Sequence, residues 1–229
     1  MKRLTNQDWI EKYKNDNIII ETKFSDKNNI LIDGIISPLK IDNRQICSPT
    51  DNQGNSPHCA GYSAAQMIEA IIWKQTGHII NLDAHQIYAK AKELDNCIDA
   101  EGTYPEATLQ AAINLSALKI FNNAKIHKIY NIDEYKTITA IKHIIHKYDF
   151  LIGGFYITDE WYNCINGKYV ISHGTNNLGG HAVLICGYDK KYVYIQNHWS
   201  KNWGAKGFAA IPWKVFLLEF MYGTYLELN

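Results

Sequence analysis

The sequence lacks an excess of charge of either sign. Its 229 residues contain 23 lysines and arginines and 23 aspartates and glutamates, so the formal net charge is zero when the histidines are neutral. Proteins that bind nucleic acid or anionic membranes usually carry a basic surface that attracts phosphate groups. We therefore expect neither nucleic acid nor a membrane among the partners of this chain.

Long hydrophobic runs are also absent. No stretch approaches the roughly 18 apolar residues that a membrane-spanning helix needs. Residues 1–20 contain no uninterrupted apolar segment of the kind found in a secretory signal. We therefore expect a cytoplasmic protein, or one that is delivered to a host cell or packaged in a virion by a non-classical route.

Cysteine patterns typical of disulfide frameworks and metal sites are missing as well. The cysteines are five in number, at positions 47, 59, 97, 164 and 186, so at least one is unpaired within a monomer. No C-x-x-C motif occurs, and no histidine stands at a metal-ligand spacing beside a cysteine or carboxylate pair. We expect no zinc site and no disulfide framework, which leaves the question of whether one thiol is reactive.

What the sequence does contain is a change of hydrophobic period near its middle. Apolar residues first recur at helical spacing, and short β-branched and aromatic runs separated by turn residues follow. These patterns predict helices at 58–75, 83–94, 105–118 and 135–148, and strands at 150–157, 182–188, 192–196, 208–211 and 224–228. The fold class is therefore α+β, with a mainly helical lobe at about 48–120 and a mainly β lobe at about 121–229.

Cys59 is the candidate reactive thiol because it lies in the first turn of the helix predicted at 58–75. Unsatisfied N–H groups and the positive end of the helix dipole favour an anion there and lower the pKa of a cysteine. The alternative is that Cys59 is an ordinary small residue of a buried helix. A nucleophile needs a base, a residue that orients the base and a donor for an oxyanion, so the rest of the sequence decides.

The remaining sequence supplies candidates for all three roles. Gln53 lies in the loop before the helix, from which its amide can reach an oxygen that is also held by the Cys59 N–H. His181 opens a predicted strand, Asn197 closes the next one, and a tight turn at 189–191 joins them. Antiparallel pairing of these strands brings the Asn197 amide to the His181 ring, where it can orient the imidazole.

Three sequence blocks, in this order, resemble the signatures of the papain family of cysteine peptidases (C1-type), including cathepsins. They are Asn52-Gln53-Gly54-x4-Cys59, Gly180-His181-Ala182 with the following strand, and Asn197-x-Trp199 with Trp203-Gly204. The resemblance covers residues 35–229. It implies a peptidase domain with a two-lobed papain-like fold, a helical left lobe, an antiparallel β right lobe and an active-site cleft between them.

The resemblance implies a role for each matched residue. Cys59 corresponds to the family's nucleophile, His181 to its general base and acid, Asn197 to the residue that orients the histidine, and Gln53 to the oxyanion donor. Trp199 falls where the family places an indole over the Asn–His hydrogen bond. No metal or organic cofactor is implied.

A second matched segment, Glu101 to Pro105, resembles the platform that binds the substrate backbone in an extended form. Gly102 matches the family pattern, whereas Thr103 replaces a second glycine, as it does in the bacterial- or viral-type branch. Gly180 and Trp199 are the substrate-binding candidates on the opposite side.

Other positions depart from the family pattern. Ser56 replaces a cysteine that many relatives use in a disulfide, and Ser200 replaces a glycine after Trp199. His58 and His198 adjoin the matched cysteine and asparagine. Either could add positive charge near the thiolate, but we expect both to be exposed bystanders.

These residues predict a cysteine endopeptidase that acts on proteins or peptides through a thioester. Two alternatives remain open: a thiol-dependent transamidase, deamidase or acyltransferase on the same fold, and an inactive binding module. Residues 1–34 are polar and weakly periodic. We expect them to form an N-terminal extension that acts as a short inhibitory or docking segment, as in a zymogen.

Overall fold

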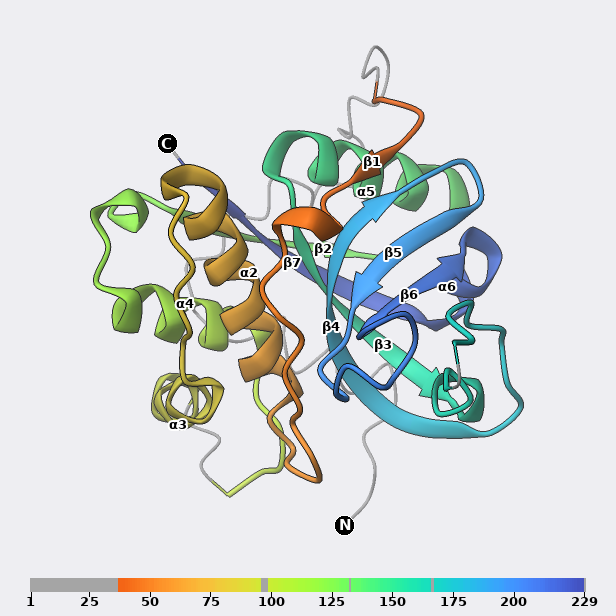
Figure 1. The fold of residues 1–229 in the computed structure, drawn as a ribbon, viewed down its shortest axis with the longest axis horizontal. Coiled ribbons are helices and arrows are strands. Elements are labelled where there is room, and N and C mark those ends of the chain that lie inside the picture. Colours follow the sequence, from red (N-terminus) through yellow and green to blue (C-terminus); the bar gives the residue numbers. More distant parts are fainter. Residues whose placement is uncertain (1–36, 96–98, 132, 166, 229) are drawn as a thin grey trace.

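Two lobes lie side by side in the computed structural model, which describes residues 37–95, 99–131, 133–165 and 167–228 (Figure 1). One lobe contains helices α2 (Cys59–Thr76), α3 (Ala84–Asp95) and α4 (Pro105–Ser116). The other contains most of a curved antiparallel sheet together with α5 (Glu134–Tyr148) and α6 (Trp213–Glu219). This arrangement confirms the predicted α+β class. The expected N-terminal extension lies outside the described residues.

Local signals fix the helix boundaries. Gly77 ends α2 in a left-handed conformation, with φ of 71°, and its N–H donates to the Trp73 carbonyl. The Asp83 carboxylate accepts hydrogen bonds from the first N–H groups of α3, and Asp133 caps α5 in the same way through the Lys136 N–H. These are the ends that the sequence predicts.

Within the described residues the sheet has seven strands, with the order β2-β7-β3-β4-β5-β6 and a short β1 paired to β4. The strands are β1 (Ile41–Asp42), β2 (Lys125–Tyr130), β3 (Leu151–Thr158), β4 (Asn177–Tyr188), β5 (Tyr192–Gln196), β6 (Phe208–Pro212) and β7 (Phe220–Glu227). Short 3-10 turns, η1 (Arg44–Ile46), η2 (Lys119–Phe121) and η3 (Asp159–Trp161), lie between them. Strand β4 is the longest and pairs with β3 and β5.

Several elements differ from those the sequence predicts. Strand β4 begins at Asn177 instead of residue 182, because its glycine-containing start pairs with β3 although it lacks β-branched residues. Strand β7 begins at Phe220 instead of residue 224, and α4 ends at Ser116, two residues early. Strands β1 and β2 and helix α6 have no counterpart in the sequence prediction, since pairing partners and packing create them.

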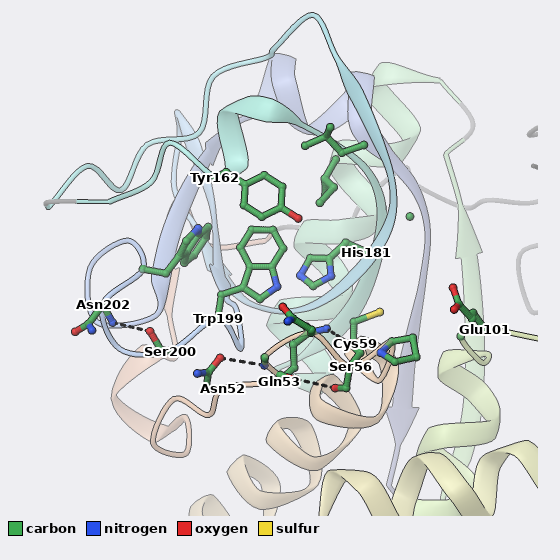
Figure 2. Close-up of a pocket in the computed structure, with 18 of the residues that line it drawn as sticks. Asn52, Gln53, Ser56, Cys59, Glu101, Tyr162, His181, Trp199, Ser200 and Asn202 are labelled. Atoms are coloured by element: carbon green, nitrogen blue, oxygen red, sulfur yellow. Dashed lines mark hydrogen bonds between the residues drawn. The ribbon is translucent and has the colours of Figure 1, made fainter.

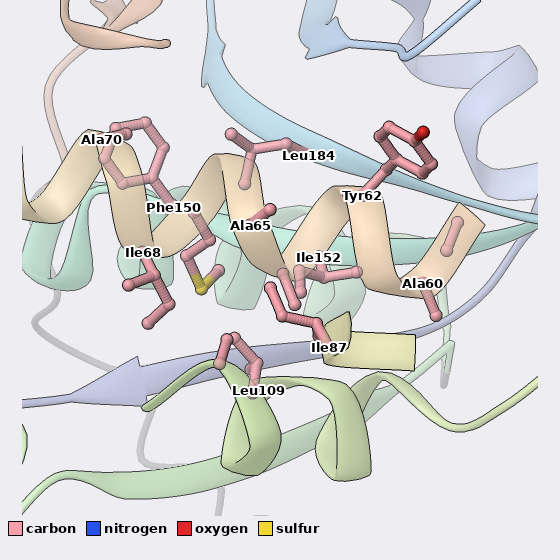
Figure 3. Packing of buried hydrophobic residues seen from close by; sticks show 14 of the residues in the cluster. Ala60, Tyr62, Ala65, Ile68, Ala70, Ile87, Leu109, Phe150, Ile152 and Leu184 are labelled. Carbon is pink, nitrogen blue, oxygen red and sulfur yellow. The ribbon is translucent and has the colours of Figure 1, made fainter. Parts of the chain in front are cut away.

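Helix α2 is buried on all sides. Its residues from Ala60 to Ile72 are all buried, including the polar residues Ser63, Gln66 and Glu69. Figure 3 shows Ile87 of α3 and Leu109 of α4 on one side of the helix and Leu184 of β4 on the other, and Ile152 of β3 belongs to the same cluster. A second hydrophobic core lies between the sheet and helices α5 and α6. None of the described helices has both the length and the apolarity needed to cross a bilayer.

A buried ion pair joins α4 to β2. Lys128 and Glu106 form it, and both side chains are 5% exposed or less. Removing one partner from a buried pair leaves an uncompensated charge, whereas replacing both by apolar residues is often neutral.

We predict that Lys128→Met lowers the free energy of unfolding by about 3–5 kcal/mol, measured by urea denaturation. Adding Glu106→Leu to that variant is expected to recover most of the loss. The matched control is Lys136→Met, which breaks an exposed pair with Asp133 and is expected to cost less than about 1 kcal/mol. Equal effects of the two lysine substitutions would contradict the prediction.

Candidate active site

A cleft of about 750 Å³ lies between the lobes and collects most of the predicted site residues. The lining includes Gln53, Cys59, Gly102, Gly180, His181 and Trp199 (Figure 2). Asn197 is buried behind His181. Thr103 does not belong to the cleft lining; its hydroxyl donates to the Asp95 carboxylate.

Cys59 is the first residue of α2, as the sequence predicts. Burial raises the pKa of its thiol, while the backbone N–H groups of Ala182, Ala60 and Cys59 lower it to a smaller extent. The N–H groups at the start of α2 thus act on the Cys59 thiol in the expected direction, but burial has the larger and opposite effect. Burial therefore favours the neutral form of the thiol in the free cleft.

His181 is oriented by the neighbouring asparagine. Its Nε2 lies 2.9 Å from the Asn197 side-chain oxygen, which also accepts the His198 N–H at 2.9 Å. Nε2 is therefore the donor, and in the neutral ring Nδ1 carries the free lone pair. Burial lowers the pKa of His181 to about 4 against the opposing effect of the Asn197 hydrogen bond, so near neutral pH the imidazole is an unprotonated base.

Trp199 covers this pair. The centre of its ring lies 4.7 Å from that of His181, with the planes 30° apart. Trp199 is positioned by a β-bridge to Asn52, in the loop that leads to α2. The indole therefore excludes water from one face of the imidazole.

The Gln53 side chain is held in a tight loop before α2. Its Nε2 donates to the Ser56 carbonyl at 2.7 Å, and its backbone N–H donates to the His198 carbonyl at 2.8 Å. An amide group has two N–H donors, and one of them is used in this loop. The second is free to bind an oxygen atom in the cleft.

His198 differs from the sequence expectation. It is fully buried instead of exposed, its ring stacks on Tyr62 at 5.4 Å, and it lies 5.1 Å from His181. Neither ring nitrogen has a hydrogen-bond partner among the described residues. Burial and the neighbouring His181 hold the pKa of His198 well below its usual value, so it is neutral and adds no positive charge to the site.

His58, the other expected bystander, is half-buried. Its Nδ1 lies 2.7 Å from Nδ1 of His85, and its ring packs on Tyr88 with the centroids 3.9 Å apart. Burial and the neighbouring His85 lower the pKa of His58. It therefore belongs to a side-chain cluster at the start of α2 and α3.

The loop that carries Gly102 is anchored by two side chains of α3. Lys92 is 7% exposed, and its ammonium group donates to the carbonyls of Ala100 and Gly102 at 2.8 and 2.9 Å. The Tyr88 hydroxyl accepts the Gly102 N–H at 3.1 Å. No sequence pattern indicated these two anchors, because their partners are backbone groups.

Of the cysteines other than Cys59, those that the structure describes do not line the cleft. Cys47, Cys164 and Cys186 are buried free thiols, and Cys97 lies outside the described residues. Within the part of the chain that the structure describes, no three histidine, cysteine or acidic side chains converge in a way that could hold a metal ion.

Comparison with known families and proteins gives a consistent match. Residues 96–215, slightly more than half of the chain, match the family described as papain family cysteine protease. The chain is 28% identical to mexicain from Jacaratia mexicana over 197 residues, which cover 76% of this chain and 88% of mexicain. It is 22% identical to cathepsin K from Mus musculus over 197 residues, which span only 59% of that protein.

Solved structures show the same fold. Xylellain, a cysteine protease from Xylella fastidiosa, superposes with a TM-score of 0.68 at 16% identity, covering 85% of this chain and 87% of xylellain. A cysteine protease from Carica candamarcensis, solved in complex with E-64, superposes with a TM-score of 0.63 at 17% identity, covering 84% and 99%. At these identities the likeness establishes the fold.

We predict that Lys92→Met lowers the free energy of unfolding by about 2 kcal/mol and accelerates amide hydrogen exchange at Gly102. Methionine keeps the length of the side chain but leaves two carbonyl groups without their donor. Lys90→Met, on the exposed side of the same helix, is the matched control and is expected to change neither quantity. Identical behaviour of the two variants in urea denaturation and exchange would contradict an anchoring role.

Proposed function

The chain belongs to the papain family of cysteine proteases, and on that premise we propose that it is an endopeptidase that cleaves peptide bonds through a Cys59 thioester. In this proposal His181 is the base and acid, Asn197 orients His181, and Gln53 binds the oxyanion. The observation that supports it most is the 2.9 Å contact between His181 and Asn197 in the cleft that Cys59 lines. We also propose Gly102, Thr103, Gly180 and Trp199 as substrate-binding residues.

Acylation begins with both groups neutral. As the Cys59 sulfur attacks the peptide carbonyl carbon, the thiol proton moves to the lone pair on Nδ1 of His181. The carbonyl electron pair moves onto oxygen, and this oxyanion accepts hydrogen bonds from the Cys59 N–H and from the second Gln53 N–H. When the C–N bond breaks, His181 returns the proton to the leaving amine.

Hydrolysis of the thioester uses the same residues. His181 removes a proton from water, the resulting hydroxide adds to the thioester carbonyl, and the C–S bond breaks as Cys59 regains its proton. The Asn197 side-chain oxygen accepts a hydrogen bond from the His181 Nε2–H group throughout, so it stabilises the imidazolium that forms in each half-reaction. These steps need no metal or organic cofactor.

We predict that E-64, the inhibitor bound in the Carica candamarcensis protease, labels the full chain once, at Cys59. Cys59→Ala abolishes labelling and peptide cleavage, whereas Cys164→Ala retains both, because Cys164 is completely buried and does not line the cleft. Mass spectrometry of a digested peptide mixture is expected to show new free termini. Folded protein that is neither labelled nor active would overturn the proposal, and products joined to another amine would indicate acyl transfer instead of hydrolysis.

We predict that the acid limb of the kcat/KM profile lies near pH 4, because the pKa of His181 is lowered to about 4. Above that pH the imidazole is the free base that accepts the thiol proton. Below it, His181 is protonated and the rate falls about tenfold per pH unit. The profile is measured with one fluorogenic peptide between pH 3 and pH 8, and a limb near pH 6.5 would mean that His181 is hydrated in the working enzyme.

A further inference from the structure

An exposed apolar surface borders one side of the cleft. Tyr162, Ile165 and Leu178 line the cleft and are 56%, 52% and 42% exposed; we call them the apolar wall. They lie in the segment between β3 and the start of β4, far from Cys59 in the sequence. Exposed apolar side chains that gather at a concave site are typical of ligand-binding surfaces.

The apolar wall is continuous with the proposed catalytic residues. The Tyr162 ring stacks on Trp199 with a centroid distance of 4.8 Å and an interplanar angle of 8°. Trp199 in turn lies 4.7 Å from His181. The three rings therefore form one stack that runs from the base out to the cleft rim.

The position of Tyr162 is fixed by its buried neighbour. Trp161 is completely buried, and its indole N–H donates to the Glu219 carboxylate at 2.8 Å. The Thr158 hydroxyl donates to the same carboxylate at 3.1 Å. Because these contacts anchor η3 at both ends, the Tyr162 ring is held over the cleft before any ligand binds.

The proposed mechanism determines which part of a substrate contacts the apolar wall. The proton on His181 must reach the leaving amine, so the residue that carries this amine lies beside His181 and next to Trp199. The acyl part then extends the other way, toward Gly102 and Glu101. Figure 2 shows Tyr162 and Trp199 on one side of Cys59 and Glu101 on the other.

Space and charge on this side suit a large apolar group. A Cβ atom at Gly179 or Gly180 would meet nothing within 4 Å, so the start of β4 leaves room between Leu178 and His181. Glu101 is the only acidic residue, and no lysine or arginine occurs, among the described residues that line the cleft. A charged side chain at the wall would lose hydration without gaining a partner.

We propose that the apolar wall selects substrates in which the residue supplying the leaving amine has a large apolar side chain, aromatic or aliphatic. This inference rests on the proposed peptidase function and adds Tyr162, Ile165 and Leu178 as specificity-determining residues. An apolar pocket discriminates between substrates that differ by one methylene group by about 10–200-fold in kcat/KM. Phenylalanine and leucine differ from aspartate by more apolar surface than that, so we expect a preference of about tenfold or more for them.

The test uses fluorescence-quenched peptides that differ only at the residue after the cleaved bond: phenylalanine, leucine, alanine, lysine or aspartate. The full chain is expected to cleave the phenylalanine and leucine peptides with the highest kcat/KM. Tyr162→Ala and Leu178→Ala reduce this preference to within about threefold, because each removes part of the apolar contact area. The labelling rate with E-64 checks that each variant keeps a functional thiol.

Matched controls use residues of the same type away from the cleft. Tyr135→Ala, at a tyrosine 69% exposed on α5, and Leu218→Ala, at a leucine 60% exposed on α6, are expected to keep the preference of the unaltered chain. Cleavage of all five peptides at similar rates, or an unchanged preference in both wall variants, would overturn this inference and leave the peptidase function standing. Cleavage of none of the peptides, together with no labelling, would overturn both.

Discussion

The pairing of β4 with β5 is the constraint on which the site depends. The pairing continues to Leu184 and Gln196, beyond which the two strands separate. His181 and Asn197 remain close enough for their side chains to form a hydrogen bond. The tight turn at Asp189 is held by its carboxylate, which accepts the N–H groups of Lys191 and Tyr192, and a β-bulge between Ile185 and Gly187 shifts the register before the strands reach the site. A shift of the register by one residue would turn the Asn197 amide away from the imidazole. The orientation of the proposed base is thus a property of the whole sheet.

Burial determines which protonation states of Cys59 and His181 are favoured in the cleft. It raises the pKa of the Cys59 thiol and lowers that of the His181 imidazole, so it favours the neutral form of both groups in the free site. Under the proposed mechanism, ionisation accompanies the attack on the carbonyl, and the helix terminus acts on charge that appears during the reaction. His198 also favours an uncharged site, because this second buried imidazole fills the space behind His181 without supplying a charge.

The sequence predicts well what depends on neighbouring residues. The N-terminal end of α2, the capping aspartates, β5 and the turn before it all follow from local patterns, and the spacing of the motifs predicts that Cys59 and His181 share a cleft. It fails where distant residues decide. The start of β4 forms by pairing with β3, and α6 packs against the second hydrophobic core. The burial of His198 depends on its contact with Tyr62. The apolar wall could not be predicted either, since only the folded chain brings Tyr162, Ile165 and Leu178 to the same cleft. The roles of the four proposed catalytic residues remain predictions.

Helix α2 has a further consequence for the type of substrate that can enter. Because the helix is buried on every side and contacts both the helical lobe and the sheet, the lobes share one core and cannot separate without exposing it. Shared packing therefore resists widening of the cleft. Under the proposed peptidase function, a folded protein would have to present a segment that is already extended, so local unfolding of the substrate would determine which of its peptide bonds are accessible.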